Sequence, residues 1–406
     1  MKTKRVIFYI VGSLLTVTFF FGIVELTTRS VSFFSGRGFS LSLHEYQATD
    51  RAITKIYQWH PFTGFTFAPN DKFQTSHANQ KTKPIISVDQ HGFLSNDPSY
   101  ELKKSADEIR VATIGGSTTA NINLPFEENW PGRLGILMQQ AYPQKKITIL
   151  NAGVPGFNTA QSIGNLALRV MPFHPDIVII YHAYNDLKAI RKDEKFSPDY
   201  SHIHQTPYGY HKQPGIWIKF LNHSMFYVRV RNKYRDYVSI RNKYNKIADK
   251  KMPVKPEHNA GNANKRLSHI PPVAISTFEQ HVRSLVAIAE AGGAKVILSS
   301  FATLHDPNLD YRDRKIIDSL SKYQKAELDA LVYFTSDLEL SAIFKGINQY
   351  NEVLKAIAEE EKTGWVDNAA SIPHDEIYFV DRVHFSKHGA NLMAENFLPV
   401  ARQLLN

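Results

Sequence analysis

The stretch IRVATIGGSTTA, residues 109–120, decides the fold class, because an apolar strand-like segment runs directly into two glycines and three hydroxyl residues. Residues 109–114 are mostly Ile, Val and Ala, as expected of a strand that is buried on both faces. Gly115 and Gly116 allow the backbone to turn sharply and to approach a ligand closely. Ser117 would then lie beyond the carboxyl end of the strand, where open α/β sheets bind their ligands.

The same pattern recurs further along the chain. Short apolar segments alternate with stretches of helical periodicity, which predicts an α/β fold with a parallel sheet covered by helices. The further predicted strands are residues 147–151, 176–181, 294–299 and 365–367. Predicted helices cover 130–142 and 278–291, and another is expected to begin at Ser336 with Glu339 completing a capping box.

One long segment, residues 187–272, interrupts this alternation and is interpreted as an insertion. Within it, six apolar or aromatic residues recur at helical spacing, and Lys251 and Pro253 are expected to end the helix. These six are Tyr227, Val230, Tyr234, Tyr237, Tyr244 and Ile247. Such a stripe is typical of a packing face, and the alternative is a surface that contacts an anionic polymer or lipid headgroups.

The positive charge of the chain is concentrated in that insertion. The formal net charge is +10, and residues 228–251 contain nine Lys or Arg and two Asp. The rest of the chain is therefore close to neutral, so the overall basicity gives little support to a nucleic-acid partner. We expect no nucleic acid to bind.

The N-terminus predicts a membrane anchor. Three basic residues, Lys2, Lys4 and Arg5, precede 19 uncharged residues at 6–24. About 20 residues are needed for a helix to cross the hydrocarbon core, and preceding basic residues favour a cytoplasmic N-terminus. No small-x-small cleavage motif follows. We expect a single-pass protein of the cell membrane whose remainder lies outside the cytoplasm, and the alternative is a cleaved signal peptide.

The chain is therefore divided into three parts. The stretch after the anchor has turn signals and aromatic residues without clear periodicity, and we interpret it as a stalk that packs on the main domain. The parts are a cytoplasmic N-terminus with its anchor at 1–29, the stalk and extension at 30–105, and the main domain with its insertion at 106–406.

Several kinds of chemistry are excluded or disfavoured by the composition. The chain has no cysteine, so disulfides, thiolate metal sites and cysteine nucleophiles are excluded. The segment around Gly115 lacks the lysine of a phosphate-binding Walker loop and does not match the dinucleotide fingerprint. We expect no metal and no cofactor. What remains is a serine nucleophile, or a plain tight turn in which Ser117 caps the next helix.

A serine nucleophile needs a base, a group that orients the base, and donors for the oxyanion. Candidates follow the predicted strands. Gly156, in NAGVPGFNT, can offer a backbone N–H, and Asn185, in YHAYND, carries a side-chain NH2. Near the C-terminus, DRVHFSKHG places Asp381 three residues before His384, a spacing that lets a carboxylate reach one ring nitrogen while the other faces the serine.

Together, these stretches resemble the four signature blocks of the SGNH (GDSL-type) hydrolases. The resemblance covers roughly residues 110–405, and VDQHGFLS at 88–95 is similar to the lead-in of membrane-anchored members. Two positions depart from the family pattern: Gly116 stands where the name-giving motif has Asp, and Ala183 where glycine is common. Neither change removes a group that the chemistry needs.

The resemblance implies a flavodoxin-like three-layer α/β/α domain with a five-stranded parallel sheet. It also implies roles for the quoted residues: Ser117 as nucleophile, His384 as base and Asp381 as the group that orients it. The N–H groups of Ser117 and Gly156 and the Asn185 side chain would form the oxyanion hole.

The implied activity is hydrolysis of an acyl ester, for example an O-acetyl ester carried by a saccharide or a lipid. Two alternatives remain open at this point. One is an O-acyltransferase of the same fold, similar to the alginate O-acetylation proteins, that modifies an envelope polysaccharide with the same triad. The other is a non-catalytic envelope assembly factor that retains the fold.

Overall fold

The computed structural model describes the chain in several stretches, which fall into two compact units. One unit comprises Met1–Gln58 and Gln205–Pro253, and the other comprises Trp59–His204 and Val254–Asn406. Described are residues 2–35, 56–75, 83–95, 100–191, 196–204, 221, 223–231, 233–234, 266–335 and 337–406.

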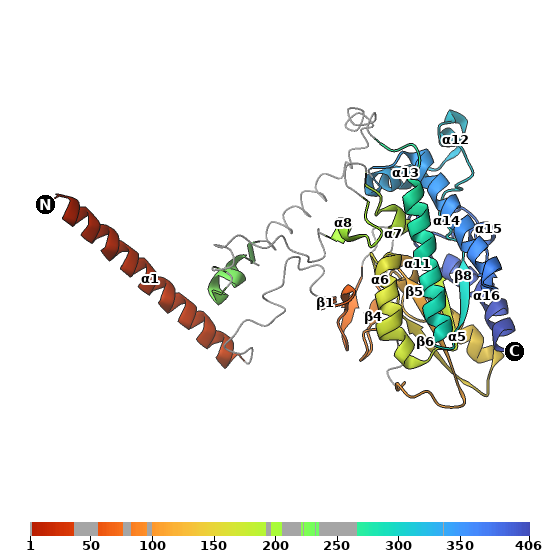
Figure 1. Ribbon diagram of the computed structural model, residues 1–406, viewed down its shortest axis with the longest axis horizontal. Coiled ribbons are helices and arrows are strands. Elements are labelled where there is room, and N and C mark those ends of the chain that lie inside the picture. The colour runs from red at the N-terminus through yellow and green to blue at the C-terminus, as the bar shows by residue number, and fades with distance from the viewer. Residues whose placement is uncertain are drawn as a thin grey trace. The chain divides into compact units, whose positions relative to one another are not determined.

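The larger unit is built around a five-stranded sheet in which every neighbouring pair is parallel (Figure 1). Its spatial order is β6-β5-β7-β8-β9. Counted along the chain, this is the order 2-1-3-4-5 of flavodoxin-like folds, so the predicted fold class is confirmed. The strands are β5 (Glu108–Gly115), β6 (Lys146–Asn151), β7 (Ile177–Tyr181), β8 (Lys295–Ser299) and β9 (Gly364–Val366).

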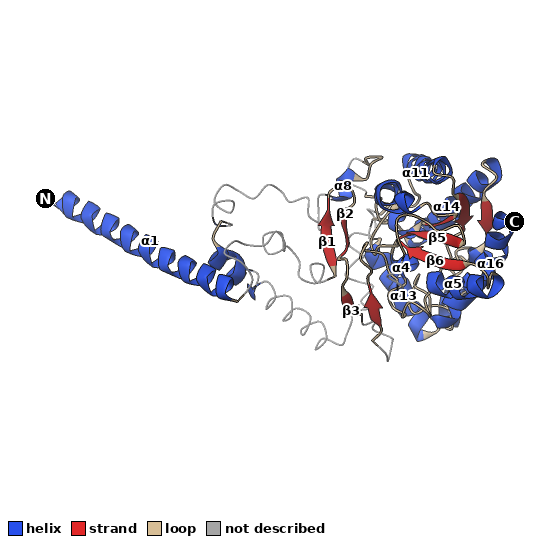
Figure 2. Cartoon of the chain, turned by 90° about the horizontal axis from the view of Figure 1, so that it is seen from below, coloured by secondary structure: helices blue, strands red, loops and turns tan. Residues whose placement is uncertain are grey.

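Helices cover both faces of this sheet and complete three layers (Figure 2). The helices α5 (Trp130–Ala141) and α16 (Lys387–Leu405) pack together on one face. The other face is covered by α6 (Thr159–Asn165), α11 (Pro272–Ala291) and α14 (Leu340–Glu360). All five residues of β7 are buried between the layers, as expected of a central parallel strand.

The N-terminal extension contains more regular structure than its sequence indicates. Four short strands, which form two separate two-stranded sheets, lie before the main sheet. They are β1 (Tyr57–His60), β2 (Gly64–Phe67), β3 (Lys72–Gln74) and β4 (Ile85–Ser87). Strands of three or four residues are too short for an alternating pattern to be recognised.

The segment VDQHGFLS is fixed to the main sheet. The Asp89 carboxylate accepts backbone bonds from His91 (2.8 Å) and Phe93 (3.0 Å) and closes a tight turn. The Leu94 N–H then donates to the carbonyl oxygen of Asn151, at the carboxyl end of β6, over 3.1 Å. This part of the extension is therefore packed against the sheet.

Two predicted helix boundaries are corrected. The helix α11 begins at Pro272, before the expected residue 278, because proline suits the first turn. Ser336 lies outside the described residues, and α14 begins at Leu340 with Glu339 at its N-cap. Glu339 therefore occupies the cap position and forms no capping box. Between β8 and α14 lie two helices that the sequence did not indicate, α12 (Arg314–Ser319) and α13 (Lys322–Phe334).

Only the beginning of the predicted basic helix is described. Residues 225–231 are helical, whereas Tyr237, Tyr244, Ile247 and the expected end at Lys251 lie outside the described residues. The described residues that precede this segment include two short helices, α7 (Tyr184–Leu187) and α8 (Ser201–His204).

The smaller unit contains the long helix α1 (Lys2–Phe34), whose stretch Val11–Phe34 is long and apolar enough to cross a membrane. Its Glu25 carboxylate accepts backbone bonds from Met225 (2.7 Å) and Phe226 (3.0 Å) and a side-chain bond from Ser224 (2.8 Å). A side chain of α1 thus caps the helical segment 225–231 of the insertion, because it satisfies N–H groups that a helix leaves free at its start.

Candidate active site

Ser117 lies where the main sheet meets its first helix. Strand β5 ends at Gly115, and Ser117 opens the short helix α4 (Ser117–Ala120). A Cβ atom at Gly115 would lie 1.9 Å from Thr119 Oγ1 and 2.5 Å from the Tyr181 carbonyl oxygen. A side chain at this position would therefore collide with the backbone of β7, which explains the first glycine.

The second glycine leaves room for an amide side chain. A Cβ atom at Gly116 would lie 2.5 Å from Asn185 Nδ2 and 3.1 Å from the Phe157 carbonyl oxygen. The Asn185 amide therefore lies closer to the end of β5 than a side chain at this position would leave room for. The absence of a side chain at position 116 thus helps to determine where the Asn185 amide lies.

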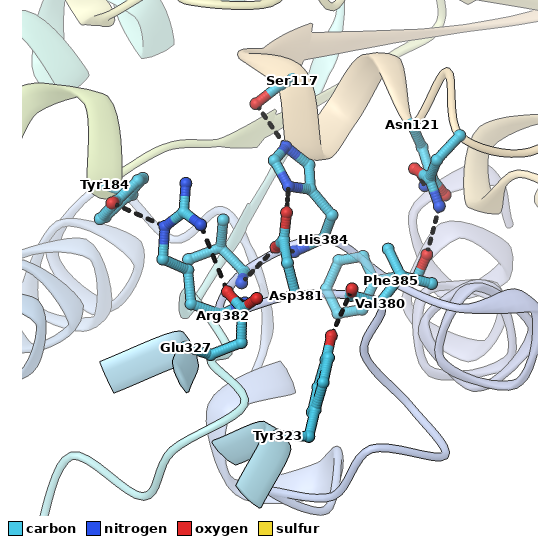
Figure 3. A network of polar contacts seen from close by, with 12 residues as sticks. Ser117, Asn121, Tyr184, Tyr323, Glu327, Val380, Asp381, Arg382, His384 and Phe385 are labelled. Carbon is cyan, nitrogen blue, oxygen red and sulfur yellow. Dashed lines mark hydrogen bonds and ion pairs between the residues drawn. The ribbon is translucent and has the colours of Figure 1, made fainter. Parts of the chain in front are cut away.

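His384 connects Ser117 to Asp381 (Figure 3). The Ser117 Oγ–His384 Nε2 distance is 2.7 Å, and the His384 Nδ1–Asp381 Oδ2 distance is also 2.7 Å. The other carboxylate oxygen, Asp381 Oδ1, accepts the backbone N–H groups of Val383 (2.9 Å) and His384 (2.8 Å). Because a carboxylate can only accept hydrogen bonds, Asp381 places the ring proton on Nδ1 and leaves Nε2 to accept from the serine.

The loop that carries His384 is held to the loop that follows Ser117. Asn121 Nδ2 donates to Asn123 Oδ1 over 2.7 Å, and Asn123 Nδ2 donates to the Phe385 carbonyl oxygen over 2.8 Å. Both asparagines are buried, so each polar group needs its partner. No sequence motif indicated Asn123, since its partner Phe385 lies far away along the chain.

Gly156 and Asn185 come from the ends of the two neighbouring strands. The Val154 N–H donates to the Gly115 carbonyl oxygen over 3.1 Å, and Asn185 Nδ2 donates to the Phe157 carbonyl oxygen over 2.8 Å. Gly156 has a φ of 89°, a left-handed conformation that favours glycine. These bonds bring three of the sequence blocks together at the carboxyl edge of the sheet, and the bond between His384 and Ser117 adds the fourth.

A buried carboxyl group, that of Asp186, directly follows Asn185 in the chain. Asp186 Oδ1 accepts the Thr159 hydroxyl (2.6 Å) and the Thr159 backbone N–H (3.1 Å), which joins α7 to the start of α6. Burial raises the pKa of Asp186 to about 6, against the lowering effect of the two bonds from Thr159. The Asp186 carboxyl therefore gains a proton more readily than an exposed carboxyl would.

A second histidine near these loops is unsuited to act as a base. The His182 side chain is buried, and its Nε2 lies 2.8 Å from Ser162 Oγ. Burial, with a smaller contribution from the charge of His281, lowers the pKa of His182 to about 3. Its bond to Ser162 and its burial indicate a packing role.

An arginine network adjoins Asp381 and His384, and the sequence analysis missed it. Arg382 Nε donates to the Tyr184 hydroxyl over 3.1 Å, and Arg382 Nη1 lies 3.3 Å from Glu327 Oε2 (Figure 3). The Arg382 guanidinium also lies over the Phe334 ring, 4.3 Å from its centroid. These partners come from α7 and α13, so no local motif relates them.

The described part of the chain offers no cluster of metal ligands. Among those residues, no group of three or more His, Asp or Glu side chains is placed to hold a metal ion. The chemistry that the described geometry offers is that of an imidazole bonded to a hydroxyl on one side and to a carboxylate on the other, the arrangement found in serine hydrolases.

Comparison with known protein families also indicates an ester hydrolase. The sequence profile of the GDSL-like Lipase/Acylhydrolase family matches residues 113–392. No curated protein sequence matches the chain.

Solved structures that resemble this one include an acetylxylan esterase from Geobacillus stearothermophilus. That structure is 17% identical with a TM-score of 0.39, and the match covers 72% of this chain and 93% of the esterase. A GDSL-like lipase from Bacteroides thetaiotaomicron is 13% identical with a TM-score of 0.36, and the match covers 72% of this chain and 88% of the lipase. Because the family profile extends over more than half of the sequence, from the end of the first sheet strand into the last helix, this chain belongs to the GDSL-like lipase/acylhydrolase family.

Proposed function

We propose that this protein is a membrane-anchored serine esterase that hydrolyses acyl esters outside the cytoplasm, O-acetyl esters of envelope saccharides among them. Ser117 is its nucleophile, His384 its general base and Asp381 the residue that orients His384. The observation that carries the proposal is the pair of 2.7 Å contacts that His384 makes with Ser117 Oγ and Asp381 Oδ2. Membership of an acylhydrolase family supports the reaction class.

In the first half of the reaction, His384 Nε2 takes the hydroxyl proton while Ser117 Oγ bonds to the ester carbonyl carbon. The imidazolium that forms is stabilised by Asp381, which accepts a hydrogen bond from the Nδ1–H group. The tetrahedral intermediate then collapses, its bond to the alcohol oxygen breaks, and His384 gives its proton to that oxygen. The alcohol leaves, and the acyl group stays on Ser117.

The negative charge of the tetrahedral intermediate needs donors at the same edge of the sheet. The backbone N–H groups of Ser117 and Gly156 and the side-chain amide of Asn185 are the candidates. Asn185 Nδ2 carries two hydrogens and uses one for the Phe157 carbonyl oxygen, which leaves the other for the oxyanion. Removal of one such donor typically raises the barrier by about 3 kcal/mol.

In the second half, water takes the place of the alcohol. His384 removes a proton from the water as its oxygen bonds to the acyl carbon. Collapse of the second intermediate breaks the bond to Ser117 Oγ, which recovers its proton from His384. The products are the free enzyme and a carboxylic acid.

The helix α1 supplies the proposed anchor. Its stretch Val11–Phe34 is long and apolar enough to span a bilayer, and Lys2, Lys4 and Arg5 precede it. Basic residues at one end of a single span favour the cytoplasmic side for that end. The larger unit would then lie outside the cytoplasm.

Hydrolysis of 4-nitrophenyl acetate by the full-length protein in a maltoside detergent tests the proposal. We expect Ser117→Ala to lower kcat by at least about 10⁴-fold, because the nucleophile is lost while the donors remain. The matched control is Ser276→Ala, on the exposed side of α11, which should leave kcat unchanged.

Each alternative gives a different result in this assay. Equal turnover by the wild type and Ser117→Ala would contradict the nucleophile assignment, and no turnover by the wild type would favour a non-catalytic role. An O-acyltransferase would move the acetyl group to an added oligosaccharide faster than to water, which mass spectrometry of the saccharide would detect.

A further inference from the structure

Beside Asp381 and His384, four side chains form what we call the cation–aromatic cluster: Lys188, Tyr184, Phe334 and Arg382. Lys188 Nζ lies 5.7 Å from the ring centroid of Tyr184 and 5.7 Å from that of Phe334. The Arg382 guanidinium lies 4.3 Å from the Phe334 centroid and donates to the Tyr184 hydroxyl. Cations over aromatic faces are attracted by the ring electrons, so two positive charges share two rings.

The cluster adjoins the proposed catalytic groups along the chain. Tyr184 directly precedes Asn185, and Arg382 directly follows Asp381. Lys188 ends the helix α7 that carries both Tyr184 and Asn185. In Figure 3 the Arg382 guanidinium and the Tyr184 ring are drawn on one side of the Ser117–His384–Asp381 chain. The Asp381 carboxylate is close enough to affect the pKa of Tyr184, which burial raises.

The charges around Lys188 do not balance. Arg382 pairs with Glu327 at 3.3 Å, and Arg191 with Asp337 at 3.8 Å. Among the described residues, no carboxylate lies within ion-pair distance of Lys188 Nζ. The charged groups in the described part of the chain that act on Lys188 are the two arginines, and both oppose its charge.

An ammonium in this position is costly in the free protein. Lys188 is half-buried, and burial, followed by the charges of Arg382 and Arg191, lowers its pKa to about 8. The tyrosine and phenylalanine rings offset only part of the lost hydration. An incoming anion would supply the counter-charge that the described side chains do not.

The outer side of the cluster is open to solvent. Phe334 is 45% exposed, and its neighbour Tyr333 is 70% exposed, although both are large apolar side chains at the end of α13. Their ring centroids lie 5.3 Å apart. Exposed aromatic rings beside an unbalanced cation suit a ligand that has both an apolar face and a negative group, as a sugar ring with a carboxylate does.

We propose that the cation–aromatic cluster is an anion subsite that binds a carboxylate on the alcohol part of the ester, so that the preferred substrate is an acylated acidic saccharide. Lys188 pairs with the carboxylate, and Phe334 contacts the face of the sugar ring. This inference rests on the proposed esterase activity, and it narrows the substrate class.

The test compares two acetyl esters that differ only in charge. One is an O-acetylated oligogalacturonate, and the other is the equivalent O-acetylated oligogalactose, with acetate release as the readout and the full-length protein in maltoside detergent. We expect Lys188→Met to raise KM for the acidic ester about tenfold more than for the neutral one, because one charge-assisted bond is lost. Lys295→Met, at the opposite end of the sheet, is the matched control and should change neither KM.

The pH dependence separates a direct charge contact from a packing role. In the wild type, the ratio of kcat/KM for the acidic ester to that for the neutral ester should fall as pH rises from 7 to 9, because Lys188, with its pKa of about 8, loses its proton. Tyr184 stays protonated in this range because its pKa is raised, and Arg382 stays charged because its pKa is raised as well.

Lys188→Arg should keep a high ratio at every pH in this range, because arginine does not titrate there. Lys188→Met should give a low ratio that does not change with pH. The proposal is overturned if the ratio changes with pH in the same way in the wild type, Lys188→Arg and Lys188→Met. It is also overturned if Lys188→Met raises KM equally for the two esters.

The outcome for the neutral ester separates this proposal from the proposed function. If the neutral ester is hydrolysed but charge has no effect, the subsite is wrong and the esterase stands. If neither ester is hydrolysed, calorimetry with unacetylated oligogalacturonate decides the subsite. Binding that weakens about tenfold in Lys188→Met supports it, and an absence of binding overturns it.

Discussion

Asp381 uses both carboxylate oxygens to set the position of His384. One oxygen accepts the ring Nδ1–H, and the other accepts two backbone N–H groups of the same loop. An asparagine at this position could still accept the backbone bonds. Its amide NH2 would face Nδ1, however, and would force the ring proton onto Nε2, where the serine proton must be received.

We therefore predict that Asp381→Asn lowers kcat by on the order of 10⁴-fold with little change in stability. His384→Ala should cost more. The double variant should be no slower than His384→Ala alone, since the groups act as a unit. Steady-state kinetics on an acetyl ester measures all three. Losses that multiply in the double variant would show that the two residues act independently.

Gly116 offers a second test at the residue scale. A methyl group there would lie 2.5 Å from Asn185 Nδ2, the movable end of a side chain, and 3.1 Å from the Phe157 carbonyl oxygen. Gly116→Ala should displace the Asn185 amide and lower kcat by about 10² to 10³-fold, because one oxyanion donor is lost.

The control for Gly116→Ala is a double-mutant cycle with Asn185→Ala. If the methyl group acts through the amide, the double variant should be no slower than Asn185→Ala alone. Additive losses in kcat would mean that Gly116 affects the reaction by another route.

At the scale of elements, the sheet was largely predictable from the sequence. Strands buried on both faces are continuous apolar segments, and each predicted strand overlaps an observed one, for instance 147–151 with Lys146–Asn151. The helices α12 and α13 were missed, because they lie between β8 and α14, where the alternation of one strand with one helix predicts a single helix.

The residues of the candidate site divide in the same way. Ser117, Gly156, Asn185, Asp381 and His384 each follow a recognisable strand or belong to a motif, so sequence reasoning found them. Their catalytic roles stay predictions. Asn123, Lys188 and Arg382 gave no signal, because each contacts a segment that is distant in the sequence: Lys188, for example, lies over the ring of Phe334.

The junction between α6 and α7 should make stability depend on pH. The folded-state pKa of Asp186 is about 6, above its ordinary 3.8, so the folded protein binds more protons than the unfolded chain between pH 4 and 6. The stability that Asp186 contributes through its raised pKa is fully present below about pH 4. It is lost as pH rises through 6, which lowers the free energy of unfolding by up to about 3 kcal/mol.

We predict that Asp186→Asn removes this loss while its side-chain oxygen still accepts the bonds from Thr159. The free energies of unfolding of the wild type and the variant are measured with urea. Between pH 4 and 6, the free energy of the wild type should fall relative to that of the variant. Asp318→Asn, whose carboxylate is 70% exposed, is the control. A difference that stays constant with pH would contradict the raised pKa.

At the scale of the whole molecule, the helix α1 predicts where the catalytic unit lies. Its stretch Val11–Phe34 follows three basic residues, so the C-terminus should be outside the cytoplasm. Alkaline phosphatase fused to the C-terminus, which is active only outside the cytoplasm, should be active in membrane fractions. An inactive fusion would contradict this orientation, and a mature protein that begins near residue 30 would show a cleaved signal peptide.

The central claim is that Ser117 is activated by His384 to attack an acyl carbon. Reaction of the full-length protein with a fluorophosphonate, followed by peptide mass spectrometry, tests it most directly, because the reagent bonds covalently to an activated serine. We predict a single adduct on Ser117 that forms at least about 10³-fold more slowly in His384→Ala. An adduct on another serine, or one on Ser117 that forms equally fast without His384, would contradict the claim.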